Sequence, residues 1–335
     1  MLSKKIGIDI GTSNLLIYVQ GTGIVVREPS LVALDQAGTR ILAVGRRAFE
    51  MVGVAPPTVR FVRPIREGAI ADLVATEGLL MHFIAKVQGR QRIFRPEIMI
   101  CVPAAVTGHE RRALIEVAMA GGARQAWLID ATLAAAMGAG LPIAEARAHA
   151  VCDIGAGSSE MAVIARSGRV VEQSVRGGGN GMDLAITDHL RRHHDLLVES
   201  GEAEASKLEA GAAVALDVPR QARVRGSDVG TGRPRTVEIG SEELTEAIQE
   251  PLQAIAAGLR EVLNQTPPGL AADIRERGLV LTGGGAGLRG LDRYLSGQIG
   301  IPTLVANDAP TCVVRGTGQA LAHFPALQRK QLYLR

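Results

Sequence analysis

Two short stretches of the sequence share a pattern that suits phosphate chemistry. Residues 6–18 read IGIDIGTSNLLIY, and residues 151–164 read VCDIGAGSSEMAVI. In each, an apolar run ends in Asp-Ile-Gly, and small or hydroxyl residues precede a second apolar run. Glycine lets the backbone approach a ligand closely, and the successive amides of such a turn bind phosphate oxygens. Asp9 and Asp153 are suited to hold a hydrated Mg²⁺, which takes only one or two protein carboxylates.

A plain tight turn, in which the Asp accepts from local amides, is the alternative for either copy alone. Two copies in separate halves of the chain favour the phosphate interpretation. Further donors would come from the hydroxyls of Thr12, Ser13, Ser158 and Ser159.

A third glycine-rich stretch, GGGAGLRG, lies between a predicted strand and a predicted helix. It contains Gly285, Gly287 and Gly290 at dinucleotide-fingerprint spacing, with Asp308 at the end of a later strand. That match is weak in a chain with 40 glycines. The same geometry also serves as a helix N-terminus beneath the phosphate and sugar of a nucleotide.

Strand and helix patterns alternate along the chain, which predicts an α/β fold. A length of 335 residues with 47% hydrophobic and 21% charged residues indicates about two ordinary domains. The net charge of +3 and 3% aromatic residues disfavour nucleic-acid binding as the main function. A long amphipathic helix is predicted to begin at Ser241 and to kink at Pro251. The three widely spaced cysteines are interpreted as buried thiols, and they are Cys101, Cys152 and Cys312.

Two further stretches have competing interpretations. His189 and His193 lie four apart, as zinc ligands on a helix do, but no third ligand is evident and a solvated polar face is favoured. Ile93 and Phe94 lie among arginines in the loop GRQRIFRP, where they could enter an anionic membrane surface or pack onto the domain. No signal peptide or membrane-spanning run is evident, so an intracellular, non-spanning protein is expected.

The two hairpins and the late LTGGG turn together resemble the actin superfamily. From about residue 4 to residue 323, the chain resembles the MreB family of bacterial actins. The matching motifs include IGIDIGTSNLLIYVQGTGIVVREPSLVAL, RPIREGAIADL, VPAAVTGHERRA, AAAMGAGLPI, DIGAGSSEMAVI, AEASKLEAG, LTGGGAGLRGLD and TCVVRGTGQAL.

This resemblance implies an actin-like two-domain fold, with duplicated ribonuclease-H-like domains and a nucleotide cleft between them. Domain I would comprise residues 1–138 and 318–335, with a small subdomain at about 32–74. Domain II would comprise residues 139–317, with a small subdomain at about 180–245.

The resemblance also implies bound Mg·ATP, with Asp9 and Asp153 facing the metal through water. The first phosphate loop would be Thr12, Ser13 and Asn14, and the second would be Gly155, Ala156, Gly157 and Ser158. Glu204, Ala205, Ser206 and Lys207 would lie by the adenosine, and the ribose and α-phosphate would rest on Gly284, Gly285, Ala286 and Gly287.

For the family, the resemblance implies antiparallel double protofilaments at the inner face of the cytoplasmic membrane. Ile93 and Phe94 would insert into the anionic membrane surface, and membrane-bound wall-synthesis proteins would be partners in directing cell shape.

The chain departs from the family pattern where ATP hydrolysis is concerned. The family's water-positioning Glu is replaced by Ala131, and loss of such a group commonly costs about two to four powers of ten in rate. Ala131 and Ser158 are therefore the catalytic positions in question, and turnover is expected to be weak or absent. Ala156 replaces a family glycine, which requires its φ to be negative.

Two enzyme classes are alternatives. A small-molecule kinase of the actin and sugar-kinase superfamily would carry a substrate-binding insertion and a catalytic Asp, and neither is evident. A dinucleotide oxidoreductase would explain residues 279–308 but would leave both Asp-Ile-Gly hairpins without a role.

Overall fold

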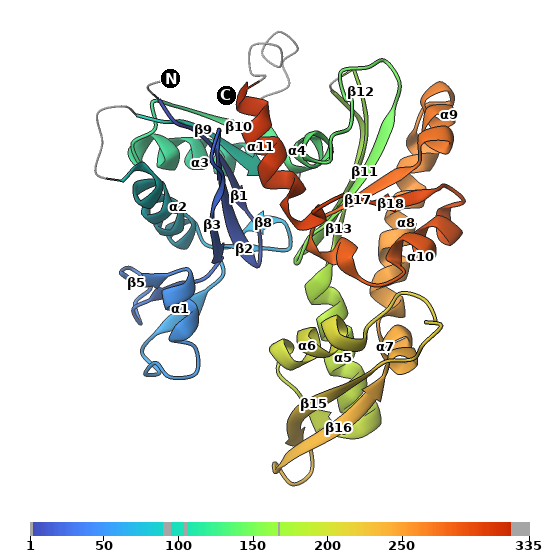
Figure 1. Ribbon diagram of the computed structural model, residues 1–335. Helices are drawn as coiled ribbons and strands as arrows, with labels where there is room; N and C mark the ends of the chain where they lie inside the picture. The colour runs from blue at the N-terminus through green and yellow to red at the C-terminus, as the bar shows by residue number, and fades with distance from the viewer. Residues whose placement is uncertain (1–2, 90–94, 104–105, 167, 323–335) are drawn as a thin grey trace. The chain divides into compact units, whose positions relative to one another are not determined.

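The structure, a computed structural model, describes residues 3–89, 95–103, 106–166 and 168–322. The chain divides into two compact units (Figure 1). Unit 1 contains residues 1–147, 164–169 and 311–335, and unit 2 contains residues 148–163 and 170–310. Helix α11 (Cys312–Ala322) packs along α4 (Ala131–Gly138), so the segment after residue 310 belongs with unit 1. The resemblance predicts this return at residue 318.

The main sheet of unit 1 has the strand order β10-β9-β1-β2-β3. Strands β1, β2 and β3 form an antiparallel meander, and β9 and β10 run parallel to β1. Apolar residues of β1 face helices α2 and α3, while α4 and α11 cover the other face (Figure 1). The elements are β1 (Lys5–Ile10), β2 (Asn14–Val19), β3 (Gly23–Pro29), β9 (Glu97–Val102), β10 (Gln125–Asp130), α2 (Leu73–Gln88) and α3 (Gly108–Ala120).

A smaller sheet of unit 1 has the order β5-β4-β6 and carries helix α1. Its own apolar cluster is small, with Leu31, Ala33 and Ala48 buried at its centre. The elements of this part of the chain are β4 (Val32–Leu34), β5 (Ile41–Val44), α1 (Arg46–Glu50), β6 (Arg60–Val62) and the hairpin of β7 (Ile65–Arg66) with β8 (Ala69–Ile70).

The main sheet of unit 2 has the order β13-β12-β11-β17-β18, which repeats the strand arrangement of the first sheet. Strand β17 runs parallel to both β11 and β18, as β9 does to β1 and β10. The repeated Asp-Ile-Gly phrase therefore marks two copies of one arrangement, and the predicted duplicated α/β fold is confirmed. The strands are β11 (His149–Ile154), β12 (Ser158–Ala165), β13 (Gly168–Arg176), β17 (Leu279–Thr282) and β18 (Thr303–Val305).

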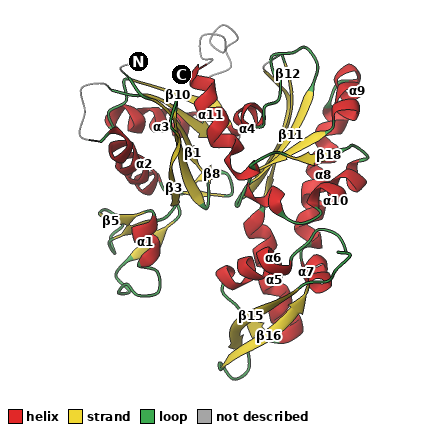
Figure 2. Cartoon of the chain, viewed as in Figure 1, coloured by secondary structure: helices red, strands yellow, loops and turns green. Residues whose placement is uncertain are grey.

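A second small sheet, β14-β15-β16, lies in unit 2 with helices α5, α6 and α7 around it (Figure 2). These elements are α5 (Gly179–His194), β14 (Leu196–Leu197), α6 (Ser200–Ala210), β15 (Gln221–Asp228), β16 (Pro234–Gly240) and α7 (Ser241–Ala247). The remaining elements of unit 2 are α8 (Gln249–Gln265), α9 (Pro268–Arg277), the 3₁₀ turn η1 (Gly284–Gly287), α10 (Leu291–Ile299) and, at the boundary with unit 1, η2 (Ala309–Thr311).

The single kinked helix expected from Ser241 is instead two helices, α7 and α8, which meet at Ile248. Pro251 lies in the first turn of α8, where backbone amides have no partner within the helix, so it fits without a kink. The three cysteines are buried and form no disulfide with one another, as predicted. Among the described residues, no helix is long and apolar enough to cross a membrane.

Candidate functional site

The first Asp-Ile-Gly hairpin lies at the carboxyl end of β1. Its turn closes through the Gly11 amide, which donates to the Asn14 carbonyl over 3.0 Å. Asp9 is half-buried one residue before the end of β1, while Asn14 is exposed. The carboxylate and the turn amides thus share one edge of the sheet, where ligands of α/β proteins bind.

Neighbouring segments hold this first turn from outside. The Arg63 guanidinium donates to the Thr12 carbonyl over 3.2 Å, and the Ser30 amide donates to the Ser13 carbonyl over 2.9 Å. Thr12 is buried and Ser13 half-buried. The carbonyls of the turn are therefore occupied, and its shape depends on one side chain and one amide from unit 1.

The second hairpin repeats the closure of the first. The Gly155 amide donates to the Ser158 carbonyl over 2.9 Å, and Ser158 is the first residue of β12. Ala156 has a negative φ, so the condition set for alanine at this position is met. The substitution of the family glycine is compatible with the turn.

The second turn is held by the backbone that leads into α5. Three amides there donate to carbonyls of the turn over 2.9–3.0 Å: Gly177 to Gly157, Gly179 to Gly155, and Asn180 to Ala156. The start of α5 is therefore hydrogen-bonded directly to residues 155–158, the second phosphate-type turn.

Asp153 is hydrogen-bonded to Thr282, a residue outside the predicted site. The Thr282 hydroxyl donates to Asp153 Oδ1 over 2.7 Å, because the two residues lie opposite each other on parallel β11 and β17. Burial raises the pKa of Asp153 to about 6, although the Thr282 hydrogen bond opposes the shift. A cation beside this carboxylate would favour its ionised form, so Asp153 fits the role of facing Mg²⁺.

The glycine-rich turn after β17 has an inner and an outer side. A Cβ on Gly283 would lie 2.4 Å from the Ile154 carbonyl oxygen, and one on Gly285 would lie 2.4 Å from Ile154 Cγ2. Gly284 and Gly287 are exposed, and a Cβ there would meet nothing within 4 Å. Close packing against Ile154 requires glycine at positions 283 and 285. Gly284 and Gly287 leave an open surface with space for a ribose and phosphate. The remaining residue of this turn, Ala286, is buried.

The four candidate adenosine residues on α6 divide by exposure. Glu204 and Ala205 are exposed, whereas Ser206 and Lys207 are buried. The Lys207 ammonium lies 2.7 Å from Asp183 Oδ1 on α5. It also donates to a carbonyl at the start of α5, that of Gly179, over 2.9 Å.

Lys207 thus links α6 to α5, whose first backbone amides hold the second turn. Burial raises the pKa of the Asp183 carboxyl, and the nearby Lys207 opposes that shift. Asp183 is a functional candidate that the sequence motifs did not reveal, because its partner lies on another helix.

Ala131, the predicted catalytic position, is the first residue of α4, directly after β10. It lies at the same sheet edge as Asp9, because β9 joins β1 to β10 in parallel register. The preceding Asp130 is ion-paired with Arg169 at 3.2 Å and with Arg111 at 3.8 Å. Because the Asp130 carboxylate is already ion-paired, it does not take the role of the Glu that the family resemblance predicts at position 131.

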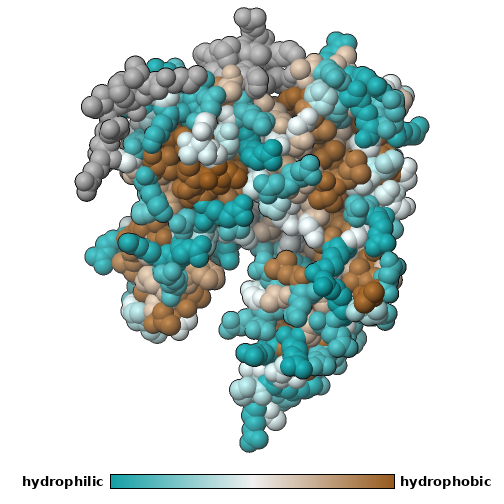
Figure 3. All heavy atoms as spheres, in the orientation of Figure 1, coloured by the Kyte–Doolittle hydropathy of each residue, from teal (hydrophilic) through white to brown (hydrophobic). Residues whose placement is uncertain are grey.

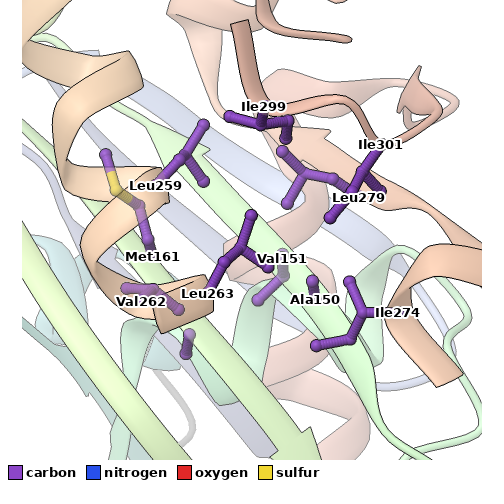
Figure 4. A pocket seen from close by; sticks show the side chains of 11 residues that line it. Ala150, Val151, Met161, Leu259, Val262, Leu263, Ile274, Leu279, Ile299 and Ile301 are labelled. Atoms are coloured by element: carbon purple, nitrogen blue, oxygen red, sulfur yellow. The ribbon is translucent and has the colours of Figure 1, made fainter. Parts of the chain in front are cut away.

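A pocket in unit 2 is apolar throughout and lies apart from these residues (Figure 4). It is a gap in the packing of helices on the sheet, with no polar group to orient a nucleotide. Its lining residues are Ala150, Val151, Met161, Ala162, Leu259, Val262, Leu263, Ile274, Leu279, Ile299 and Ile301.

The predicted membrane residues Ile93 and Phe94 lie outside the described residues. The other candidate residues fall into two groups, one in each unit. Those of unit 2 are joined through β11, β17 and the start of α5, and those of unit 1 share the edge of β1, β9 and β10.

A family model described as MreB/Mbl protein matches residues 3–329 of this sequence. The chain belongs to the MreB/Mbl family. It is 47% identical over 326 residues to the cell shape-determining protein MreB of Escherichia coli strain K12, covering 96% of this chain and 94% of that protein. It is 38% identical over 332 residues to the cell shape-determining protein Mbl of Bacillus subtilis strain 168, covering 99% and 100%.

A solved structure of the MreB family matches the fold. The crystal structure of MreB5 of Spiroplasma citri bound to AMPPNP superimposes with a TM-score of 0.91 at 32% identity, covering 99% of this chain and all of that one. The actin-like fold implied by the sequence motifs is therefore confirmed for this MreB-family chain.

Proposed function

We propose that this MreB-family chain binds Mg·ATP through its two Asp-Ile-Gly hairpins and assembles with copies of itself into filaments that direct cell shape and wall synthesis. One observation carries the nucleotide part of this proposal. Asp153, the second phosphate-type turn and the open glycine surface of η1 all lie at the carboxyl ends of the neighbouring parallel strands β11 and β17. The relatives named for cell shape and the AMPPNP-bound MreB5 structure support it.

The backbone amides and the carboxylates of the proposed site have different roles. Amides of residues 12–14 and 155–158 hold phosphate oxygens, and Asp9 and Asp153 hold the waters of Mg²⁺. When bound, Mg²⁺ neutralises phosphate charge. The exposed Glu204 and Ala205 lie on the side of α6 that can meet the adenosine. Lys207 ties α6 to α5, and the buried Ser206 donates to the Ala203 carbonyl within α6.

Hydrolysis is slow in this proposal because Ala131 lacks an acceptor for the attacking water. A methyl group neither orients a water molecule nor takes its proton. The nearest carboxylate in sequence, Asp130, is held by Arg169. The chain therefore favours holding ATP over cleaving it.

An exposed apolar surface on the small subdomain of unit 1 suits contact with a second copy. Phe49, Val52 and Val54 are exposed by 56%, 51% and 80%. Figure 3 shows apolar residues gathered on the part of the molecule that carries α1. Large exposed apolar patches commonly mark protein–protein contacts. The proposed assembly is an antiparallel double protofilament.

The proposed location is peripheral, at the inner face of the cytoplasmic membrane, with Ile93 and Phe94 entering the bilayer surface. Membrane-bound wall-synthesis proteins are the proposed partners. Liposome flotation tests the membrane contact: the double variant Ile93→Ser with Phe94→Ser should lose binding to anionic vesicles, and retained binding would contradict this part.

Equilibrium binding tests the nucleotide site. ATP with Mg²⁺ should bind and NAD should not. Gly284→Val places a branched side chain on the open surface of η1 and should weaken ATP binding at least about tenfold. Gly297→Val on α10 is the control, because this position also has free space but does not face the proposed ligand. It should leave the ATP affinity unchanged.

Sedimentation and electron microscopy with ATP, with ADP and with liposomes test assembly. Polymer should form, and Val54→Glu should prevent it. Polymer absent under every condition would contradict the filament proposal while leaving the nucleotide test intact. A phosphorylated small-molecule product would instead favour the kinase alternative.

A further inference from the structure

Two histidines and a glutamate meet at the end of α5, far from the proposed phosphate site. His189 Nε2 lies 2.9 Å from Glu243 Oε1, and His194 Nε2 lies 2.5 Å from the same oxygen. Among the described residues, this is the one group of three potential metal ligands whose ligand atoms all lie within 4.8 Å of one another. Because His189 and His194 are in the second half of α5 (Gly179–His194), the cluster lies about 15–22 Å along the helix from the second phosphate-type turn.

The cluster revises the sequence interpretation of the two histidines four residues apart. His193 is exposed and stacks on His189, with ring centroids 4.3 Å apart, and it is not part of the group. The second nitrogen comes instead from His194, the last residue of α5. The third ligand, absent from the local sequence, is Glu243 in the first turn of α7, which packs against α5.

The geometry points to a binding site for a divalent transition metal, with Zn²⁺ as the occupant we propose, held by His189, His194 and Glu243. Two imidazole nitrogens and one carboxylate oxygen are a ligand set that Zn²⁺ takes in proteins, with water in the fourth position. The side chains of the three residues are 11%, 24% and 32% exposed, which provides both an entry path and room for that water.

Small side-chain movements bring the three atoms to zinc geometry. Tetrahedral zinc with bonds of 2.0–2.1 Å places its ligand atoms about 3.3 Å apart. The two nitrogen–oxygen distances must therefore widen by several tenths of an ångström, within reach of side-chain rotation. Both Nε2 atoms already face one oxygen, so the metal takes the place of these two contacts, and each neutral imidazole carries its remaining proton on Nδ1.

The charge of the cluster suits a cation. The Glu243 carboxylate lies within hydrogen-bond distance of both imidazole rings. It supplies negative charge to a bound cation, and the two rings supply nitrogen ligands. Mg²⁺ prefers oxygen ligands, so the cation proposed for Asp9 and Asp153 does not compete for this site.

Zinc titration of the full chain tests the site. The chain is prepared without a histidine tag, stripped of metal and kept free of nucleotide, so the result is independent of the ATP proposal. One Zn²⁺ per chain should bind, and Co²⁺ in its place should give visible d–d absorption. His194→Gln and Glu243→Gln should each weaken binding more than about 100-fold, beyond the 10–100-fold that an outer partner costs.

His193→Gln is the matched control on the same helix and should leave the zinc affinity unchanged. Zn²⁺ should also raise the melting temperature of the wild type and of His193→Gln but not that of His194→Gln, which separates lost ligation from lost folding. The proposal is overturned if no stoichiometric Zn²⁺ binds, or if His193→Gln abolishes binding while Glu243→Gln retains it.

Discussion

The two Asp-Ile-Gly hairpins have similar sequences and equivalent places in their sheets, but they are held in different ways. The first turn is held from outside by the Arg63 side chain and one amide, that of Ser30. Three backbone amides leading into α5 hold the second turn, and Lys207 and Asp183 tie α6 to the same helix. A single side-chain substitution can remove the Arg63 contact, whereas the backbone hydrogen bonds of the second turn depend on the local path of the chain.

The difference divides the proposed functions between the units. The second hairpin is hydrogen-bonded to the start of α5, so it is the more rigid of the two proposed phosphate sites. The sheet of the first hairpin carries the catalytic position, and there the structure offers Ala131 and an ion-paired Asp130. Substitution of Ala131 in unit 1 should therefore change cleavage, whereas backbone changes at the second turn in unit 2 should mainly change binding.

The largest effect is expected at the first sheet. Ala131→Glu restores an acceptor for the attacking water and should raise ATP hydrolysis by about two to four powers of ten, measured as phosphate release. Ala131→Gln, which has the same size but cannot take a proton, should remain slow. Mg·ATP affinity should be similar in all three proteins. A wild type that already hydrolyses ATP as fast as Ala131→Glu would contradict the expectation.

The second turn should be the more sensitive of the two to backbone change. Gly178 has a φ of +154°, and a Cβ there would lie 2.4 Å from the Gly155 carbonyl oxygen. Gly178→Ala should lower the free energy of unfolding by about 2–4 kcal/mol and greatly weaken Mg·ATP binding. Denaturant melts and nucleotide titration measure both effects.

Gly181→Ala is the control for this variant, because a Cβ at Gly181 in the first turn of α5 would meet nothing within 4 Å. It should be neutral or stabilising. Equal losses in the two variants would show that the turn is not held by close backbone contact.

The sequence predicted the repeated hairpins because their pattern is local, and the register of each turn follows from Asp-Ile-Gly. It did not predict that Thr282 pairs with Asp153, since those residues are 129 positions apart and meet only through strand register. Glu243 was not predicted as a metal ligand for the same reason, because it lies 54 positions from His189. The break at Ile248 was missed because Pro251 was assigned to a helix interior and lies at a helix start.

A smaller effect, with a defined pH dependence, is expected at Asp153. Its pKa is raised from 3.8 to about 6, so the folded protein holds that proton more tightly than the unfolded chain does. The ionised group therefore costs stability progressively as the pH rises from 3.8 to 6, and the cost is complete above pH 6. Asp153→Asn should stabilise the nucleotide-free protein by about 1–3 kcal/mol at pH 7.5 and by roughly half as much at pH 5.

Urea unfolding at the two pH values measures this gain. Asp228 is the control in the same unit, because hydrogen bonds led by the Thr231 amide lower its pKa. Asp228→Asn should give no gain at either pH. A gain from Asp153→Asn that does not change with pH would assign the effect to packing instead. The same variant should weaken Mg·ATP binding, since it removes a carboxylate proposed for the metal.

The smallest effect should come from the side chain that holds the first turn. Arg63→Met keeps an unbranched apolar stem and removes the donor to the Thr12 carbonyl, at a cost of about 0.5–1.5 kcal/mol in stability. Mg·ATP binding should weaken by less than about tenfold, because Ser30 still holds the turn through its amide. Arg66→Met, at an exposed position nearby, controls for the lost charge. If Arg63→Met weakens binding as much as Gly178→Ala does, the two hairpins are equally sensitive, and the proposed distinction between a turn held by a side chain and a turn held by backbone hydrogen bonds is wrong.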